Sequence, residues 1–524
     1  MDEQVLMKLL VIILAFSALL AIPFPGRAAD AVPQIRLNIK GFLVEGENPL
    51  SAEQTRSVLN IFLGDHEGLE GLVEAAAELE SAIVGAGHSF HRVILPPQTL
   101  DGNQIRLQVI VLRLANIEVT GNQHFQADNI RASLPGLVPG TAPDTEVLTR
   151  EIQVANEHPA KQLMLRLKQS DAPDSVDAEI AVQDRRPWQI FSVLNNTGTE
   201  ETGEFRLSAG LQHSNLLNRD DTLTLSYTTS PDHFEEVQQY GVNYRYPLYS
   251  LSGSLSVFYS HSDVDSGVVA QVFEISGAGD FFGAQFRHTF RNFGSYRHRL
   301  TLGLEDRYFE NNIDFSGTPV GIDVRTRPWS LQYGGDYTFE RSKVAFYLGY
   351  LHNLPGGGNN NDAIYSAARF GAVRDWEAGR YGASFIMALP RDWSLNVDWI
   401  GQYAGEPLVA GEQFGLGGVD SIRGFGERVI TGDSGNRLRL VVWTPQLAKS
   451  IRLLGFLDAG QVDIEQPAVG QIDNETLISL GLGLRWQWHE QWNASLDYGH
   501  EINKLRGIAT EDGEKVHFSI FFRY

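Results

Sequence analysis

The residues whose types and spacing indicate chemistry in this sequence are a cation, Arg423, and a carboxylate, Asp458. Arg423 lies in a Gly-rich stretch, residues 413–435, between two segments in which apolar and polar residues alternate. Asp458 lies inside the otherwise apolar segment 455–460. An unpaired charge away from bulk water is costly, so a guanidinium placed there needs a carboxylate. If the flanking segments are membrane strands, we expect Arg423 to pair with Asp458 at the mouth of a barrel.

Elsewhere in the sequence, the residue types that catalyse reactions or bind metals do not have the spacing of a catalytic or metal-binding motif. The 14 His residues show no HExxH pattern or paired spacing, and no Ser stands in a GxSxG frame. The chain has no Cys, which excludes disulfide scaffolds and Cys-ligated metals. We therefore expect no catalytic centre, no metal and no cofactor, and we do not expect an enzyme.

Composition narrows the class of protein further. The chain has 524 residues, a net charge of −22, 52 Gly and 10% aromatic residues. This length predicts two to four units. The negative charge argues against nucleic acid as a partner, since such a protein needs a basic face. After the N-terminus no apolar run is long enough for a membrane helix, which leaves a transmembrane β-barrel open, because barrel strands alternate.

Residues 1–28 have the pattern of a signal peptide. Lys8 precedes an almost wholly apolar run from Leu9 to Ile22, and small residues follow. We place the cleavage site near Ala28. Translation from Met7 would give a more typical positively charged start than Met1, and a membrane anchor is the alternative interpretation of the apolar run.

Residues 34–113 have the pattern of a small α/β domain. Alternation predicts a strand at 35–39, Ser51 has the position of a helix cap, and a second helix is expected from about 69 to 85. Strands are expected around 93–95 and 105–111, separated by Pro96-Pro97-Gln98 and the turn Asp101-Gly102. The residues expected on the buried face of the second helix are Leu72, Ala75, Ala76, Leu79 and Ile83.

Residues 114–186 repeat this order of elements. Strands are expected near 117–119, 163–167 and 178–182, and helices near 127–134 and 145–156. The similar length and order predict a tandem repeat of the first domain.

From Trp188 to Tyr524 the pattern changes to segments of about ten residues that alternate strictly. Leu223, Leu225 and Tyr227, for example, alternate with polar residues. Short connections also alternate with long Gly- and Asn-rich loops, which is typical of an outer-membrane barrel. Aromatic residues recur at segment ends, as an interfacial girdle requires: Trp188, Tyr246, Tyr249, Trp329, Trp376, Trp393, Trp486, Trp488, Trp492 and Tyr524.

About sixteen strands are expected in residues 188–524. Residues 367–377 can be read as a seventeenth strand, but an even number requires them to lie in an extracellular loop, where they could form a short helix. The fold class expected is therefore mixed, with two small α/β periplasmic domains followed by a 16-stranded antiparallel transmembrane β-barrel. The last strand has one apolar face with a terminal aromatic residue, a signal for barrel assembly: Phe518, Ile520, Phe522 and Tyr524.

In this order of parts and in its motifs, the chain resembles the TpsB transporters of two-partner secretion, relatives of the BamA-type insertases. The two α/β modules resemble POTRA domains, the first with Pro96, Pro97, Gln98, Asp101 and Gly102 as its signature. The tetrapeptide Ile422-Arg423-Gly424-Phe425 resembles the motif at the tip of the family's sixth extracellular loop, here about 406–436, which folds into the lumen. Gly455, Phe456, Asp458 and Gly460 resemble the motif on the lumen side of strand thirteen that receives this Arg.

The resemblance implies an outer-membrane location in a Gram-negative bacterium and a pore that exports one large partner exoprotein. The POTRA domains would capture the unfolded cargo in the periplasm, and export would need no ATP. The barrel would contact outer-membrane lipid, and the barrel-assembly machinery would insert it. The alternatives are an insertase of the BamA or TamA type and a passive porin. Family members often have a helix that plugs the pore, and the few residues between Ala28 and the first strand leave no room for it here.

Overall fold

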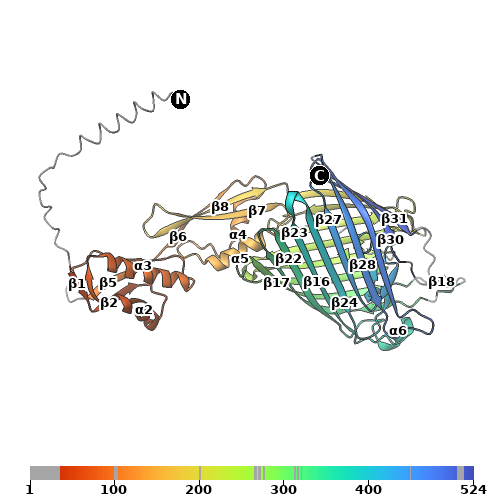
Figure 1. Ribbon diagram of the computed structural model, residues 1–524, viewed down its shortest axis with the longest axis horizontal. Coiled ribbons are helices and arrows are strands. Elements are labelled where there is room, and N and C mark those ends of the chain that lie inside the picture. The colour runs from red at the N-terminus through yellow and green to blue at the C-terminus, as the bar shows by residue number, and fades with distance from the viewer. Residues whose placement is uncertain are drawn as a thin grey trace, which may run out of the picture. The chain divides into compact units, whose positions relative to one another are not determined.

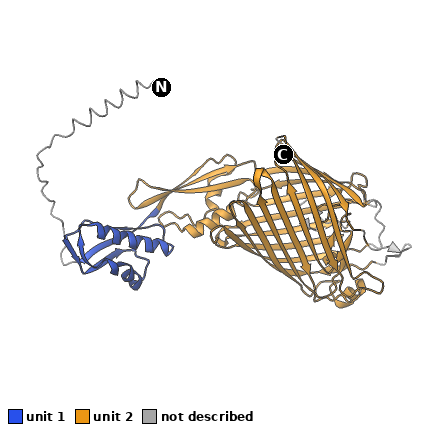
Figure 2. Ribbon diagram, viewed as in Figure 1, with its two compact units in different colours: residues 1–113 blue, residues 114–524 orange. Residues whose placement is uncertain are grey.

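The structure, a computed structural model, describes residues 36–524 apart from 100–103, 200–201, 236, 265–267, 270–272, 275–277, 312–313, 316–317, 320, 449, 504 and 506–512. The expected signal peptide and the turn Asp101-Gly102 lie outside the described residues. The chain forms two compact units, one up to Arg113 and one from Leu114 to Tyr524 (Figure 2).

The first unit is a three-stranded sheet with helices. β2 (Gly41–Gly46) pairs in parallel with β5 (Gln104–Val111), and β4 (His91–Ile94) pairs antiparallel with the other side of β5, so β4 is an edge strand. The helices are α2 (Ala52–Leu59), the short 3₁₀ turn η1 (Asn60–Phe62) and α3 (Glu70–Gly85). The buried residues of α3 are those that its sequence predicts: Leu72, Ala75, Ala76, Leu79 and Ile83.

Two local features of this unit have clear causes. α2 begins at Ser51 because its hydroxyl accepts from the Gln54 amide while the Gln54 side chain accepts from the Ser51 amide, which is a capping box. A separate antiparallel ribbon joins β1 (Arg36–Ile39) to β3 (Gly64–Glu67). The pattern did not predict β3, because the segment Gly-Asp-His-Glu has no apolar alternation and depends on β1 for its pairing.

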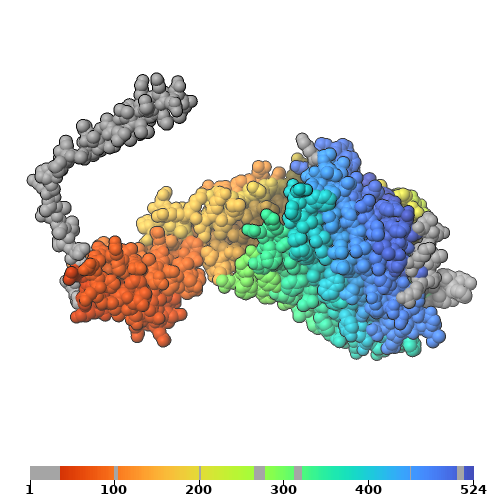
Figure 3. All heavy atoms as spheres, in the orientation of Figure 1, coloured from red at the N-terminus to blue at the C-terminus, as the bar shows by residue number. Residues whose placement is uncertain are grey.

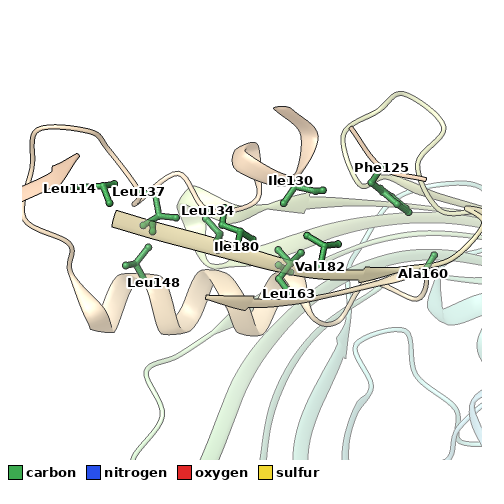
Figure 4. Packing of buried hydrophobic residues seen from close by; sticks show 12 residues of the cluster. Leu114, Phe125, Ile130, Leu134, Leu137, Leu148, Ala160, Leu163, Ile180 and Val182 are labelled. Carbon is green, nitrogen blue, oxygen red and sulfur yellow. The ribbon is translucent and has the colours of Figure 1, made fainter. Parts of the chain in front are cut away.

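The second unit begins with a sheet in the order β6-β8-β7 and two helices. The elements are β6 (Arg113–Thr120), α4 (Ala127–Ala132), α5 (Thr145–Ala155), β7 (Lys161–Gln169) and β8 (Ser175–Asp184). Figure 4 shows Ile130 and Leu134 near α4, Leu148 on α5, and Ile180 and Val182 on β8 pointing into one shared core. The expected strands and helices of this region are confirmed, with bounds that differ by a few residues.

The remainder of the second unit is a closed antiparallel barrel (Figure 1). The first part of β17 pairs with β21 and its end pairs with β20, so β20 and β21 are one interrupted strand and the described residues form sixteen barrel strands. The expected fold class is confirmed. The barrel strands are β9 (Trp188–Asn195), β10 (Arg206–His213), β11 (Thr222–Thr229), β12 (Gln238–Leu248), β13 (Gly253–Ser262), β16 (Gly279–Thr289), β17 (Tyr296–Phe309), β20 (Val324–Thr326), β21 (Pro328–Thr338), β22 (Ser342–Asn353), β23 (Glu377–Ala388), β24 (Ser394–Tyr403), β27 (Ser434–Trp443), β28 (Ile451–Asp463), β29 (Asn474–Trp488), β30 (Trp492–Glu501) and β31 (Glu514–Arg523).

Alternating exposure separates the two faces of the barrel wall. In β28, Leu453 and Leu457 are 40% and 41% exposed, whereas Phe456 and Asp458 between and beside them are buried. Because successive strand residues point to opposite faces, the exposed apolar set faces outward and the buried set faces the lumen. In Figure 3 the strands from green to blue lie next to one another across the visible face of the barrel.

The connections differ at the two ends of the barrel. The end near β7 and β8 has short turns, two of them being η2 (Tyr249–Leu251) and η3 (Pro390–Asp392). The other end, here called the loop end, has the long connections. Three of these matter below: loop five (354–376) with α6 (Asp362–Ala368), loop six (404–433), and loop seven (464–473). Figure 1 shows α6 at the loop end.

Short strand pairs also occur at the loop end. They are β14 (Val268–Val269) with β15 (Phe273–Glu274), and β18 (Asp314–Phe315) with β19 (Thr318–Pro319). Loop six has its own short pair, β25 (Phe414–Leu416) and β26 (Ile430–Gly432), and the 3₁₀ turn η4 (Ala410–Glu412).

Loop five resolves the question of a seventeenth strand. Residues 367–377 form no strand before β23 begins at Glu377, and a short helix is present, although it starts earlier, at Asp362. Trp376 is 1% exposed within this loop, so its expected place in the outward aromatic girdle is wrong. The pattern misplaced it because a Trp next to a strand end looks the same whether it faces lipid or a folded loop.

The barrel closes between β31 and β9. Ser519–Arg523 pair with Phe191–Asn195, and the Asn196 side chain continues this ladder by donating to the Val516 carbonyl and accepting from the Phe518 amide, at 2.7 and 2.8 Å. Among the described residues, no helix has both the length and the apolar character needed to cross a membrane.

Candidate functional site

Loop six folds back into the barrel and places its tip against the inner wall. Ile422, Arg423 and Phe425 are each at most 1% exposed. Ile422 and Phe425 pack in an apolar cluster with loop-six residue Leu416 and with Val462 and Leu477 of the wall strands β28 and β29. The apolar neighbours of the Arg therefore anchor the tip on both sides of the charge. The expected extent of the loop, 406–436, differs slightly, because residues 434–436 belong to β27.

Arg423 and Asp458 form a buried bidentate ion pair. The guanidinium donates from Nε to Oδ2 at 2.7 Å and from Nη2 to Oδ1 at 2.8 Å, and the Arg423 amide lies 3.3 Å from Oδ2. The side chains are 1% and 0% exposed. The guanidinium carbon also lies 3.5 Å from the centroid of the Phe456 ring. The two planar groups match in geometry, and the aromatic face adds a cation–π contact, so a Lys could not replace all of these contacts.

The wall supplies further charges that the sequence analysis did not select. Asp497 on β30 lies 3.6 Å from Arg423 Nη1 and accepts two hydrogen bonds from Arg485, at 2.6 and 2.8 Å. Arg439 Nε lies 3.7 Å from Asp458 Oδ1. The tip therefore sits in a network of alternating charges. Asp497 is one polar residue in a regularly alternating strand, and nothing local marks it as part of the site.

Glycines bring the loop tip close to the wall. Gly424 has φ +96° and donates from its amide to His517 Nε2 at 3.3 Å. A Cβ on Gly499 of β30 would lie 2.5 Å from the Gly424 nitrogen, a distance that real Cβ atoms do not reach. Gly460 has the same role for Leu416, whose side chain a Cβ would meet at 2.8 Å. Loop six can approach the wall this closely only because Gly499 and Gly460 have no side chain.

One residue of the expected lumen motif does not belong to it. Gly455 lies on the outward face of β28, opposite Leu482, which is 69% exposed, and an added Cβ would find its nearest neighbours at 3.9 and 4.0 Å. The motif's other members, Phe456, Asp458 and Gly460, are separated by even steps and share the lumen face. An odd step from Asp458 puts Gly455 on the opposite face.

A second carboxylate holds the ascending stem of loop six to the wall. Glu412 is 1% exposed and accepts from Arg307 and from the Thr326 hydroxyl, both at 2.6 Å. Gln402 of β24 donates to the Glu412 carbonyl at 2.9 Å. Loop six is thus attached to the barrel wall at its stem as well as at its tip.

The first unit contains the expected Pro96-Pro97-Gln98 segment and, separately, a groove. The Gln98 amide pairs with the backbone of Arg106 on β5, donating at 2.9 Å and accepting at 2.8 Å, as a strand neighbour would. The groove has a volume of about 510 Å³ and lies between α3 and the edge strand β4. Its lining residues include Val73, Ala77, Val84 and Ile94, which are mostly apolar and exposed.

Within the second unit, the β6–β8 domain docks on the barrel through a buried polar network. Asp220, in the turn between β10 and β11, accepts from Lys161 at 2.6 Å, from Ser133 at 2.7 Å and from Tyr249 at 2.5 Å. Lys161 and Asp220 side chains are 0% and 1% exposed. The pKa of Lys161 is lowered, because the effect of burial outweighs the opposing effect of Asp220. Burial and the Asp220 charge both raise the pKa of Tyr249. A domain held by such a network is fixed relative to the barrel, since separating the partners would leave buried charges unpaired.

His158 belongs to the same junction. Its Nε2 donates to the Ser214 carbonyl of the barrel turn, and its Nδ1 accepts from the Ala160 amide at 3.2 Å. These contacts require the neutral ring. Burial lowers the pKa of His158 to about 4, with Lys161 adding to the effect and Asp220 opposing it.

The C-terminal aromatic residues lie on the outward face of β31. Their rings contact aromatic neighbours at distances of 4.7 Å between Trp492 and Phe522 and 5.7 Å between Trp188 and Tyr524. Phe518 and Ile520 share this face, because they follow the same even steps.

Comparison with known proteins gives the family. Residues 175–486 match the family described as haemolysin secretion/activation protein ShlB/FhaC/HecB, and residues 37–111 match the ShlB-type POTRA domain. The heme/hemopexin transporter protein HuxB of Haemophilus influenzae is 22% identical over 401 residues, which cover 74% of this chain and 68% of that protein. The outer membrane transporter CdiB of Dickeya dadantii is 22% identical over 424 residues, which cover 76% and 72%.

Solved structures share the fold. CdiB from Escherichia coli matches with a TM-score of 0.75 at 17% identity, over 97% of this chain and 93% of that chain. CdiB from Acinetobacter baumannii matches with a TM-score of 0.67 at 16% identity, over 100% and 98%. The family match over more than half of the chain, the N-terminal POTRA fold and the sixteen-stranded barrel show that this protein belongs to the ShlB/FhaC/HecB family, the TpsB-type transporters that secrete partner proteins across the outer membrane.

Proposed function

We propose that this transporter captures one large exoprotein in an unfolded state with its first POTRA domain, passes it through the barrel lumen, and releases it at the cell surface without ATP. The observation that carries the proposal is the tip of loop six, held inside the lumen by the buried pair Arg423–Asp458. A passive porin has no need for two periplasmic domains or for a loop tip that a buried ion pair holds against the lumen wall.

The groove of the first unit supports cargo capture. β4 is an edge strand, and edge strands accept an added strand from another chain through backbone hydrogen bonds. The apolar lining beside it, with Val73 59% and Val84 41% exposed, offers places for alternate side chains of that strand. The Val93 amide is already bonded to Glu80 at 2.8 Å, so Glu80 has to release it when cargo binds. Backbone pairing of this kind suits an unfolded chain, because it demands little of its sequence.

Loop six supports a role as the movable element of the pore. Its tip is attached to the wall by side-chain contacts and by two closely packed glycines, with no covalent link. Cargo entering the lumen can displace it if the new contacts compensate for the broken ion pair. Folding of the cargo outside the cell would then make export irreversible. We also propose that the barrel-assembly machinery recognises the outward aromatic face of β31.

The test is a secretion assay with the large exoprotein encoded beside this gene, if one exists. We expect cargo in the medium or on the cell surface with the wild-type protein. Arg423→Ala should abolish export while the barrel remains folded and heat-modifiable in the outer membrane. Ala77→Phe should strongly reduce export, because Ala77 lines the groove and its new ring fills it.

Glu78→Phe is the matched control for the groove. Glu78 is the next residue on α3, is exposed and does not line the groove, so this variant should export normally. Wild-type export by Arg423→Ala would overturn the role of the loop tip, and equal export by both Phe variants would overturn capture in the groove. Equal export with and without the transporter, together with loss of other barrels from the outer membrane, would indicate an insertase.

A further inference from the structure

Three loops at the extracellular mouth meet at one buried carboxylate, Asp433, at the descending stem of loop six. Asp433 is 0% exposed. Arg369, which follows α6 in loop five, donates to both of its oxygens, with Nη2 at 2.5 Å from Oδ2. The Leu408 amide of loop six and the Glu465 amide of loop seven donate to it at 2.8 Å each. One carboxylate thus joins loops five, six and seven.

Both oxygens of the Asp433 carboxylate accept hydrogen bonds from several donors. Gln413 Nε2 lies 3.3 Å from Asp433 Oδ1, which adds a fifth donor to the four above. Arg369 also donates to the carbonyls of Leu408 and Glu465. A fully buried carboxylate with a bidentate Arg and several amide donors is a strong and specific contact. It forms only when the three loops are in this arrangement.

The contact differs from the other two anchors of loop six. Arg423 binds Asp458 and Glu412 binds Arg307, and both partners are on barrel strands. The partner of Asp433 is Arg369, which lies on another loop. The first two anchors hold loop six against the wall, whereas the third holds loop five over loop six.

An apolar cluster continues this contact between loops five and six. Tyr365 and Trp376 of loop five are 0% and 1% exposed and pack with Leu408 and Val409 of loop six. Leu351 of β22 joins the cluster, so one face of α6 is packed against residues of the barrel strands. The Tyr365 hydroxyl donates to the Arg325 carbonyl at 3.0 Å, which ties α6 to the strand β20. Loop five therefore closes over the stem of loop six at the mouth through which cargo leaves.

We infer that Arg369 is a positioning residue that clasps loop five onto loop six through Asp433, and that this clasp must open for an exoprotein to leave the pore. The inference rests on the proposed export function. It adds a second release step at the mouth, distinct from the release of Arg423 in the lumen. Without the clasp, loop five moves away from loop six and the empty pore conducts ions more readily.

The absence of Cys from the chain allows a reversible test. Arg369→Cys and Asp433→Cys are combined, and a short bismaleimide with a reducible disulfide in its linker is used to join them. We expect the cross-linked protein to lose export and to regain it after reduction. The same double variant without the reagent should export, because the loops are then free to part.

A conductance measurement in planar bilayers tests the clasp without any cargo. Arg369→Ala should show more frequent or larger openings than the wild-type protein. Arg374→Ala is the matched control, because Arg374 forms an ion pair with Asp375 within loop five, at 2.8 and 2.7 Å, and its backbone bonds to Asp362 of loop five and Asn353 of β22. It should behave as the wild-type protein does. Heat-modifiable gel mobility confirms that each variant is a folded barrel.

The outcomes separate this inference from the proposed function. Unchanged export by the cross-linked protein, or unchanged conductance of Arg369→Ala, overturns the clasp. If the wild-type protein exports no cargo while Arg369→Ala still raises conductance, the clasp between loops five and six stands, and the proposed export function and its release step fail. Single-Cys variants treated with the reagent must export normally, since a loss there would mean that modification itself blocks the mouth, which would also overturn the inference.

Discussion

At the scale of single residues, the loop tip is held by a combination of charge, aromatic and steric contacts. Arg423 pairs with Asp458 and lies over the Phe456 ring. Removing one partner of such a buried pair typically costs about 3–5 kcal/mol, because the other charge stays buried without a partner. The glycines beside the ion pair are equally important for this contact, since they allow the loop tip to come close enough to the wall for the pair to form.

The contact between Gly424 and Gly499 gives a prediction that leaves every charge in place. Gly499→Ala puts a methyl group 2.5 Å from the Gly424 nitrogen, so the loop tip must move away from β30. We expect a loss of stability of about 1–3 kcal/mol, the usual cost of overpacking. The measurement is the temperature at which the detergent-solubilised barrel loses its heat-modifiable mobility.

Gly455→Ala is the control for this change. Gly455 is also in a barrel strand, but it faces outward, and a Cβ there meets only ordinary contacts at 3.9 Å or more. Its melting temperature should stay at the wild-type value. Equal melting of the two variants would show that the close approach of loop tip and wall does not contribute to stability.

At the scale of elements, loop six and the β6–β8 domain are attached to the barrel in different ways. Loop six is held at its tip, at Glu412 and at Asp433, all through side chains that can release it. The β6–β8 domain is held to the barrel turns through Lys161 and Asp220. The loops at the mouth are therefore separable from the wall, while the domain at the other end is built to stay in place.

This docking should weaken in acid through His158. The ring is neutral in the folded state, with a pKa of about 4 against an ordinary value of 6.5. The unfolded state therefore binds the proton more readily, and stability falls as the pH decreases from about 6.5 toward 4. We expect His158 to contribute a loss on the order of 2 kcal/mol by pH 5, measured as the difference between the wild-type protein and His158→Gln. Urea unfolding can be followed by a fluorophore on a Cys introduced at Met164, which is 57% exposed.

His158→Gln should lack this contribution, because Gln does not titrate. Glu151 acts in the opposite direction, since burial raises its pKa to about 7 and its contribution to stability decreases as the pH rises from 4.5 to 7. Glu151 is present in both the wild-type protein and His158→Gln, so its contribution cancels in the difference between their free energies of unfolding. Parallel loss of stability in both proteins on acidification would exclude His158 as the cause.

At the scale of the whole molecule, the barrel wall has an apolar outer face and a charged inner face one residue apart. Leu457 faces outward next to Asp458, which faces the lumen. A register slip of one residue would exchange the two, so pairing along β27, β28 and β29 is strongly specified.

At this scale, the cost of placing a charge on the outer face of the barrel should depend on how deep in the membrane the position lies. Leu457→Arg places a charge on the lipid face in the middle of β28 and should destabilise the inserted barrel by about 2–4 kcal/mol. Gln461→Arg is on the same face of the same strand but nearer the loop end, and should cost about 1 kcal/mol or less. The measurement is reversible urea unfolding in lipid vesicles. Equal costs would mean that both positions lie at the same depth.

The sequence by itself determined the elements and one long-range contact. Periods of two and 3.6 residues are local properties, so the face of α3 and the alternation of strands such as β28 could be predicted. Arg423 and Asp458 could be paired because each stands out against its surroundings, a cation in a Gly-rich loop and a carboxylate in an apolar strand, and each needs a partner of opposite charge.

Only the tertiary structure decided which ordinary polar residues become buried partners. Asp433 and Asp220 lie among other polar residues, and Asp497 occupies an ordinary polar position of an alternating strand, so nothing in their neighbourhoods distinguishes them from exposed carboxylates. Their partners, Arg369, Arg485 and Lys161, come from other loops or strands, brought near by the closure of the barrel and the folding of its loops. The burial of Trp376 was decided in the same way, because burial depends on what the rest of the chain places over a residue, and that is not encoded in its immediate sequence.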